Sequence, residues 1–332
     1  MPTNINCCGE CGEEGGASLK VCKSCMLVKY CNAECQKKHW PTHKIACKLR
    51  AAELRDEALF KDPPPLEDCP ICFLPMPAQL VCCIPLPPAT ILSVPIYDFA
   101  IANEGLASKE MDNYFSCCGK SICKGCIYSF SKSGNIEKCP FCKADHVDKT
   151  DEERIKELIK RVEVNDAGAM YVLGNFYYHG GRGLMQDKER AMKLYTRAAD
   201  LGYSKAHCEL GNIYNQGGDL KKAKFHFETA AMFGCEASRY TLGRMEIKSG
   251  KREQCVKHWT IAASAGDYDA MNALLLAFNH GLVSRESIDS IMKSYNNSCT
   301  EMRSEARDAF IQNACSQQII SGASDAFVRF SS

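Results

Sequence analysis

The close pairing of cysteines in the first 142 residues is the feature that most limits how this chain can fold. Of its 23 cysteines, 18 lie before residue 143, mostly in Cys-x2-Cys pairs, and the other five are scattered singly. Closely paired cysteines suit metal chelation, whereas a disulfide framework more often links distant positions of a secreted chain. The residues before Cys7 form no apolar run of the kind that marks a secretory signal. We therefore expect metal-binding modules in a reducing compartment, cytoplasmic or nuclear or both.

Charge and hydropathy exclude several classes of partner. The 41 Lys and Arg residues balance the 40 Asp and Glu residues, whereas a nucleic-acid-binding protein needs a basic surplus to displace counterions from phosphates. Residues 80–97 carry no charge, but they contain four prolines, and a proline inside a helix costs roughly 3 kcal/mol. We expect a packed, extended insertion there, with no membrane partner, no nucleic acid and no small-molecule substrate.

Composition divides the 332 residues into blocks, and this length has room for two or three domains. We expect a first Cys-rich module, a helical linker, a second Cys-rich module with an apolar insertion, a helical array and a C-terminal tail. In that order they occupy residues 7–47, 48–66, 67–146 (insertion 73–116), 151–310 and 311–332.

A sequence repeat identifies the helical array. An Ala-Ala-x-x-Gly motif begins at residues 198, 230 and 262, and an aromatic residue three positions earlier recurs at the same interval of 32 residues. Repeats of this length mark solenoids, in which small residues let paired helices cross tightly and the aromatic residue fills the gap opposite. The first unit, Gly183-Leu184-x-x-Asp187-x-x-x-Ala191-x-x-x-Tyr195, resembles the Sel1-like repeat, a relative of the tetratricopeptide repeat. Residues 270–310 look like a degenerate fourth unit. The resemblance implies an array that binds a client protein.

The first Cys-rich module has four chelating pairs: Cys8-x2-Cys11, Cys22-x2-Cys25, Cys31-x3-Cys35 and His43-x3-Cys47. Zinc takes four such ligands in a tetrahedron, so eight ligands make two sites. Cys7 competes for the position of Cys8.

The order of these pairs resembles the MYND finger, with Tyr30 and Cys31, then Gln36 and Trp40, at the matching positions. This resemblance implies that the first and third pairs share one Zn2+ and that the second and fourth pairs share another. It also implies a groove for proline-containing peptides lined by Gln36 and Trp40, although Trp40 is equally suited to a core.

The second Cys-rich module resembles an all-cysteine RING finger. The strings that carry the resemblance are Cys69-Pro-Ile-Cys72, Cys117-Cys118-Gly-Lys-Ser-Ile-Cys123-Lys-Gly-Cys126 and Cys139-Pro-Phe-Cys142. The resemblance implies one Zn2+ on the pairs Cys69/Cys72 and Cys123/Cys126, and a second on Cys139/Cys142 with Cys117 and Cys118. Because adjacent ligands are geometrically awkward, Cys82 or Cys83 remains an alternative, and the module holds one or two zinc ions.

If this module works as RING fingers do, it binds a ubiquitin-charged E2 enzyme and orients the thioester without any catalytic nucleophile of its own. The residues expected to face the E2 are Ile71, Pro140 and Lys143. The first two also suit a zinc knuckle with no ligase activity. We found no catalytic constellation elsewhere in the sequence and no cofactor other than zinc.

Together these features predict a mainly α protein in which two small zinc-stabilised α+β modules precede an α-helical Sel1/TPR-like solenoid. The combination resembles a RING–Sel1 family of unicellular algae. The hypothesis is a RING-type E3 ubiquitin ligase that recruits substrates through its MYND finger and repeats. The alternative is a non-enzymatic scaffold that binds partners through all three modules.

Overall fold

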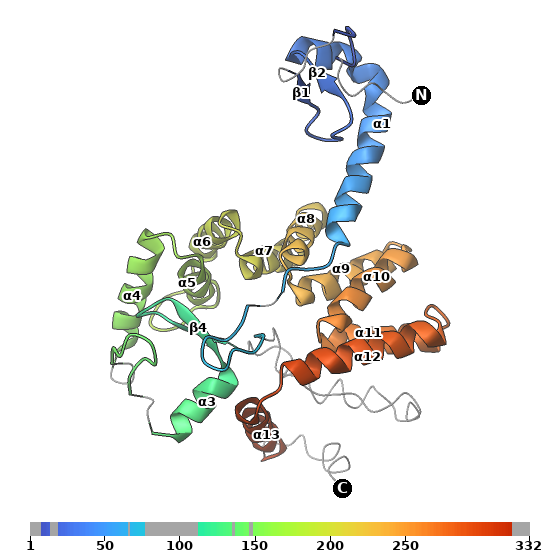
Figure 1. Ribbon diagram of the computed structural model, residues 1–332. Helices are drawn as coiled ribbons and strands as arrows, with labels where there is room; N and C mark the ends of the chain where they lie inside the picture. Colours follow the sequence, from blue (N-terminus) through green and yellow to red (C-terminus); the bar gives the residue numbers. More distant parts are fainter. Residues whose placement is uncertain are drawn as a thin grey trace. The chain divides into compact units, whose positions relative to one another are not determined.

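The computed structural model describes residues 8–13, 19–65, 67–76, 112–134, 137–145 and 149–320 (Figure 1). The predicted mainly α class is confirmed, because helices occupy most of these residues. The chain divides after Lys61 into two units. The first holds the first Cys-rich module with its long helix, and the second holds the second Cys-rich module together with the repeats.

The first unit combines a short hairpin with one long helix. Strands β1 (Lys20–Val21) and β2 (Lys29–Tyr30) pair antiparallel, and helix α1 spans Ala33–Leu59. The helix begins where the side chain of Asn32 accepts a hydrogen bond of 2.9 Å from the amide of Cys35. The predicted boundary at 47/48 falls inside α1. The linker is therefore the continuation of the helix that carries the last chelating pair, and it is not a separate element.

The second Cys-rich module is built around a hairpin and a short helix. Strands β3 (Asp112–Phe115) and β4 (Lys120–Cys123) pair antiparallel, and helix α3 (Lys124–Lys132) follows directly. The predicted insertion at 73–116 was too wide at its C-terminal end, because β3 belongs to the module. Residues 77–111, which include the apolar segment 80–97, lie outside the described residues.

The repeats form successive helix pairs, with α4 before them and α13 after them (Figure 1). The helices are α4 (Asp151–Glu163), α5 (Ala167–His179), α6 (Lys188–Asp200), α7 (Ser204–Gln216), α8 (Leu220–Met232), α9 (Glu236–Lys248), α10 (Arg252–Ser264), α11 (Tyr268–Asn279), α12 (Arg285–Glu301) and α13 (Glu305–Ile320). The expected degenerate fourth unit corresponds to α11 and α12. The predicted start of the tail at residue 311 falls inside α13.

A glycine facing an aromatic ring sets the spacing of each helix pair. A Cβ atom added to the glycine would lie 2.7, 2.7 and 2.2 Å from a ring atom in the pairs Gly174/Tyr195, Gly211/Phe227 and Gly243/Trp259, respectively. Only a residue without a side chain permits this approach. The 32-residue period is therefore the period of one recurring contact between helices.

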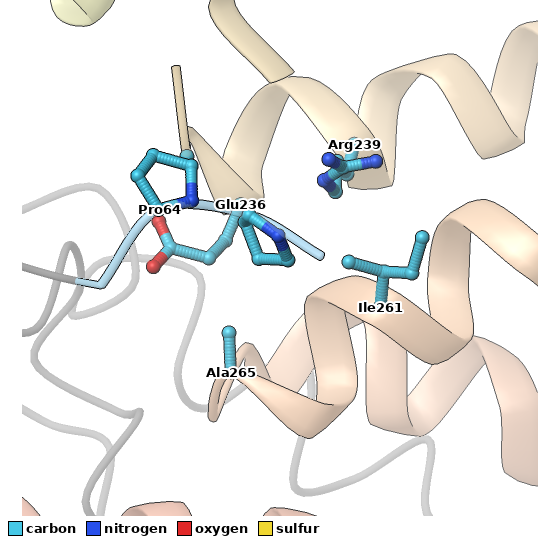
Figure 2. A pocket seen from close by; sticks show the side chains of 7 residues that line it. Pro64, Glu236, Arg239, Ile261 and Ala265 are labelled. Atoms are coloured by element: carbon cyan, nitrogen blue, oxygen red, sulfur yellow. The ribbon is translucent and has the colours of Figure 1, made fainter. Parts of the chain in front are cut away.

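The start of the second unit packs against the array. Pro63 and Pro64 line a cavity of about 30 Å³ together with residues of α9 and the end of α10 (Figure 2). Pro64 lies 3.3 Å from the position that a Cβ on Gly234 would take. The proline run at 63–65 is thus held on the repeats and does not act only as a helix stop.

The glycine–aromatic contact gives a direct test of the repeat packing. We expect Gly211→Ala to lower the free energy of unfolding of the array by about 1–3 kcal/mol, since the methyl group must displace Phe227. Gly181→Ala is the matched control, because no heavy atom lies within 4 Å of its Cβ position. Urea denaturation followed by far-UV circular dichroism measures both, and equal stability of the two variants would contradict the contact.

Candidate metal centres

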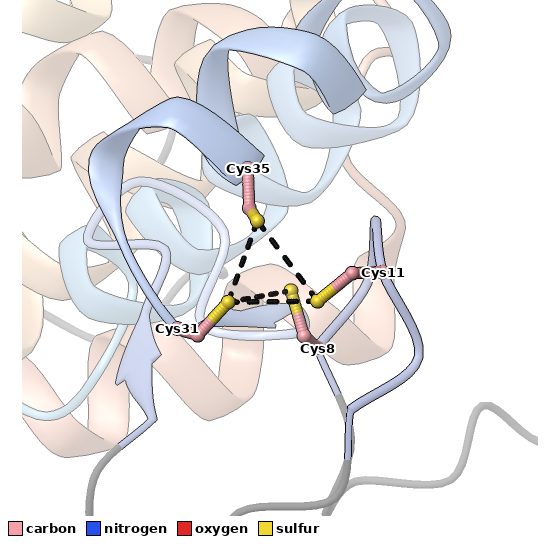
Figure 3. Close-up of side chains that lie close together, drawn as sticks. All are labelled: Cys8, Cys11, Cys31 and Cys35. Carbon is pink, nitrogen blue, oxygen red and sulfur yellow. Dashed lines mark hydrogen bonds between the residues drawn. The ribbon is translucent and has the colours of Figure 1, made fainter.

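The first group of ligands brings together Cys8, Cys11, Cys31 and Cys35 (Figure 3). Cys31 directly follows β2, and Cys35 lies in the first turn of α1. The sulfur of Cys31 lies 3.5 Å from that of Cys11, 3.6 Å from that of Cys8 and 3.4 Å from that of Cys35. Only one of these cysteines is in the helix, which corrects the expectation that both ligands of an x3 pair are helical. Cys7 lies outside the described residues.

The second group consists of Cys22, Cys25, His43 and Cys47, and all four side chains are buried. His43 and Cys47 lie one turn apart on α1. The sulfur of Cys22 is 3.8 Å from that of Cys47, and the sulfur of Cys25 is 3.3 Å from Nε2 of His43. Burial, followed by the neighbouring His39, lowers the pKa of His43. The imidazole is therefore kept neutral, as a metal ligand must be.

His39 belongs to the support of this group and not to its ligands. Its ring stacks on that of His43 with centroids 5.3 Å apart, and its Nδ1 is joined to the hydroxyl of Tyr30 by a hydrogen bond of 2.8 Å. The sequence indicated a surface residue here, but the side chain is partly buried. This contact orients the ring next to a ligand, which is how residues around a metal site fix its geometry.

The third group consists of Cys69, Cys72, Cys123 and Cys126. The sulfur of Cys69 lies 3.8 Å from that of Cys126, and the sulfur of Cys72 lies 3.9 Å from that of Cys123. Backbone amides also point at the sulfurs: the amide of Cys126 donates to Cys123 Sγ at 3.5 Å, at the start of α3. Amides aimed in this way favour thiolates over thiols.

The fourth group consists of Cys117, Cys118, Cys139 and Cys142. Both adjacent cysteines take part, and the sulfur of Cys118 lies 3.7 Å from that of Cys139. Cys117 and Cys118 occupy the turn between β3 and β4, which closes at Gly119 with a φ of 73°. The alternatives Cys82 and Cys83 lie outside the described residues.

The four groups suit zinc in both geometry and donor chemistry. Within each group, all ligand atoms lie within 4.8 Å of one another. A tetrahedral ion with Zn–S bonds of about 2.3 Å requires sulfurs roughly 3.8 Å apart, and the sulfur separations given above run from 3.4 to 3.9 Å. Thiolate-rich sets select soft or borderline metals over magnesium or calcium. Four protein ligands fill the coordination sphere, as in structural zinc sites.

The residues predicted to bind partners lie at the surface. Ile71 is 38% exposed, and Pro140 is half-buried beside the exposed Lys143, whose Nζ donates to the carbonyl of Pro140 at 3.2 Å. In the first module, Gln36 is exposed and Trp40 is 39% exposed, with its ring edge-on to His43. Trp40 is therefore not a core residue, which removes one of its two sequence-based interpretations.

Two arginines that sequence reasoning missed contact the second Cys-rich module. Arg161 of α4 donates to the carbonyl oxygens of Ser116 at 2.8 Å and Cys117 at 3.2 Å. Arg307 of α13 contacts the third group. Neither arginine lies in a motif or has a recurring position in the repeats, so no local signal marked them.

Comparison with known proteins identifies two families on this chain. The profile of the MYND finger matches residues 8–47, and that of the Sel1 repeat matches residues 167–203 and 204–232. MYND fingers and Sel1 repeats are protein-interaction modules. The chain is thus suited to bind other proteins and carries Cys/His clusters compatible with zinc.

The curated relatives match only short segments. The chain is 36% identical over 67 residues to the ERAD-associated E3 ubiquitin-protein ligase component HRD3A of Arabidopsis thaliana, which is 20% of this chain and 10% of the relative. It is 53% identical over 34 residues to the human histone-lysine N-methyltransferase SMYD3, which is 10% of this chain and 8% of the relative. The chain therefore spans about a tenth of the length of each.

Among solved structures, a Sel1 repeat protein from Oxalobacter formigenes is similar, with 22% identity and a TM-score of 0.42, covering 54% of this chain and 71% of that one. The c5321 antigen of uropathogenic Escherichia coli has 21% identity and a TM-score of 0.38, covering 62% and 50%. Separately, no helix within the described residues has the length and apolar character needed to cross a membrane.

Removal of one ligand tests the metal assignment of the first module. We expect Cys25→Ser to reduce the metal content of the purified chain by at least one ion, counted by native mass spectrometry. Structural zinc supplies about 10–16 kcal/mol to such small modules, so hydrogen exchange within residues 19–47 should also rise sharply. Cys255→Ala is the control, because Cys255 is buried but belongs to none of the four groups. An unchanged ion count in Cys25→Ser would remove this residue from the ligand set.

Proposed function

We propose that this chain is a RING-type E3 ubiquitin ligase whose MYND finger and Sel1 repeats recruit the substrate, and that it acts in the cytoplasm, the nucleus or both. The observation that carries the proposal is the interleaving of ligand pairs in the second Cys-rich module. The first and third pairs along the chain form one group, and the second and fourth form the other. This cross-braced order is the one that the resemblance to RING fingers implied.

The two knuckles of this module support E2 binding. Ile71 lies between Cys69 and Cys72 and exposes part of its side chain, and the neighbouring Phe73 is 76% exposed. Pro140 has the equivalent place between Cys139 and Cys142. An exposed apolar residue on a rigid metal-bound turn offers little binding entropy to lose, which suits a protein partner.

Under this proposal the chain supplies position and no reacting group. The amine of a substrate lysine attacks the thioester carbonyl between the E2 cysteine and ubiquitin, and the E2 thiolate leaves. The RING-like module would hold the charged E2, while the repeats and the MYND finger would hold the substrate within reach. Such positioning can account for several kcal/mol of a barrier.

A non-enzymatic scaffold is the second candidate, because a zinc knuckle needs neither an E2 nor ubiquitin to be stable. The HRD3A match is to a ligase component, and it covers only 20% of this chain. The SMYD3 match covers 34 residues, so it favours a shared finger and no shared chemistry.

Replacement of the knuckle isoleucine separates the two candidates. We expect the wild-type chain to form ubiquitin conjugates with at least one member of an E2 panel, and Ile71→Ala to lose about tenfold or more of that rate, as for a central interface residue. Met185→Ala is the control, since Met185 is 88% exposed but lies in a loop of the repeats. No conjugates with any E2, from a chain that holds its full metal complement, would favour the scaffold.

The groove of the MYND finger is tested separately with a library of proline-containing peptides. We expect Trp40→Ala to weaken binding by about tenfold or more, because a partly exposed tryptophan is the kind of side chain that dominates such contacts, and Gln36→Ala to weaken it less. Leu49→Ala on the same helix, with Leu49 62% exposed, is the control. Isothermal titration at constant metal content measures all three, and equal affinities would place the groove elsewhere.

A further inference from the structure

Helix α13 returns to the second Cys-rich module after the whole array, and it carries one fully buried arginine. Arg307 has no exposed surface, although it is the residue type most often found in water. It follows Cys123 by 184 residues in the sequence. In Figure 1, α13 and α3 lie next to each other.

The guanidinium of Arg307 points at the sulfurs of the third ligand group. Its Nε donates to Cys123 Sγ at 3.4 Å, and its Nη2 donates to Cys72 Sγ at 3.5 Å. Each ligand pair of this group therefore contributes one sulfur to the arginine. A contact of this kind bridges the two halves of the site.

Backbone carbonyls hold the guanidinium in that orientation. Nη1 donates to the carbonyl of Pro75 at 2.8 Å and to that of Met302 at 2.6 Å, and Nη2 also donates to that of Leu74 at 3.2 Å. Leu74 and Pro75 directly follow the first knuckle, whereas Met302 directly precedes α13. The arginine thus ties the knuckle to the end of the array.

Close packing of the two helices leaves no other place for the side chain. A Cβ atom on Gly125 of α3 would lie 2.6 Å from Cγ of Arg307 and 2.7 Å from its Cα and N. One turn further along α3, the ring of Tyr128 lies 6.0 Å from that of Phe310 on α13. The glycine permits the backbone of α13 to approach the helix that begins at a metal ligand.

The charge of a loaded site explains why an arginine is stable here. Four thiolates outweigh the charge of one divalent ion, so a zinc-loaded group of four cysteines is anionic. Hydrogen bonds from a cation to an anionic acceptor are roughly twice as strong as neutral ones, whereas neutral thiols are weak acceptors. A buried guanidinium that loses such a partner costs several kcal/mol.

We propose that Arg307 is a positioning residue of the metal site formed by Cys69, Cys72, Cys123 and Cys126, and that it makes the docking of α13 depend on the metal in that site. Metal binding at the knuckle and closure of the array onto the module are then one coupled event. The inference rests on the metal-binding part of the proposed function and is independent of ubiquitin transfer.

The test uses the full-length chain loaded with cadmium-113, whose NMR shift reports hydrogen bonds to ligand sulfurs. In Arg307→Met we expect one resonance of an all-sulfur site to shift while the other sites keep theirs, and metal release from that site to a chelator to accelerate about 10–100-fold. Arg307→Lys keeps the charge but loses the planar fork, so its shift and release rate should lie between those of the wild type and Arg307→Met. Arg285→Met, on the exposed face of α12, should change neither.

Hydrogen exchange on the wild-type chain gives the reciprocal measurement and requires no variant to fold. As chelator removes the metal of this site, exchange in α13 should rise about tenfold or more, while α8 stays protected. Unchanged resonances, release rates and α13 exchange in a metal-loaded chain would overturn the role of Arg307 alone. A wild-type chain that holds no metal at these four cysteines would overturn both this role and the proposed metal site.

Discussion

The crowding of cysteine sulfurs is the constraint on which the first 142 residues depend. Among the described residues, the buried cluster of the first module consists of four cysteines and Tyr30, which is far too little apolar surface to fold about 40 residues. Crowding without a cation opposes ionisation: burial, together with the nearby Cys22 and Cys25, raises the pKa of Cys47 to about 12. A divalent metal reverses this preference, because it binds thiolates and displaces their protons. The same ion therefore supplies the folding energy and sets the geometry, and acid releases both.

The second unit adds a different use of the same chemistry. Its Cys-rich module contacts the array at the array's beginning and again at its end. Arg161 donates to the carbonyls of the turn that carries Cys117, and Arg307 donates to sulfurs of the other ligand group. Because an arginine has several donors in a rigid plane, each of these side chains fixes both a position and an orientation. The module and the repeats therefore form one unit in the structure, although their sequences have no composition in common.

The parts of this structure that the sequence predicted are those that rest on short-range spacing or on a period. Cys-x2-Cys turns place two sulfurs together whatever surrounds them, and the 32-residue period recurs because each unit repeats one glycine–aromatic contact, such as that of Gly211 with Phe227. The pairing of the pairs came from family resemblance. The contact of α13 with α3 had neither kind of signal, since Arg307 and Cys123 are joined only in the folded chain. The continuation of α1 through residue 47 was missed for a related reason: no capping residue or glycine marks a helix end there.

The position of α13 also bears on how a ligase built in this way would work. Helix α13 covers the face of α3 that carries Gly125, while Ile71 on the first knuckle stays 38% exposed. An E2 bound at the knuckles would therefore leave α13 in place, and the array would keep a fixed orientation relative to the thioester. In a mechanism that relies on position alone, a rigid connection between the client-binding surface and the E2 raises the effective concentration of the substrate lysine. Loss of the metal would remove the E2 surface and this connection together, because both depend on the same four sulfurs.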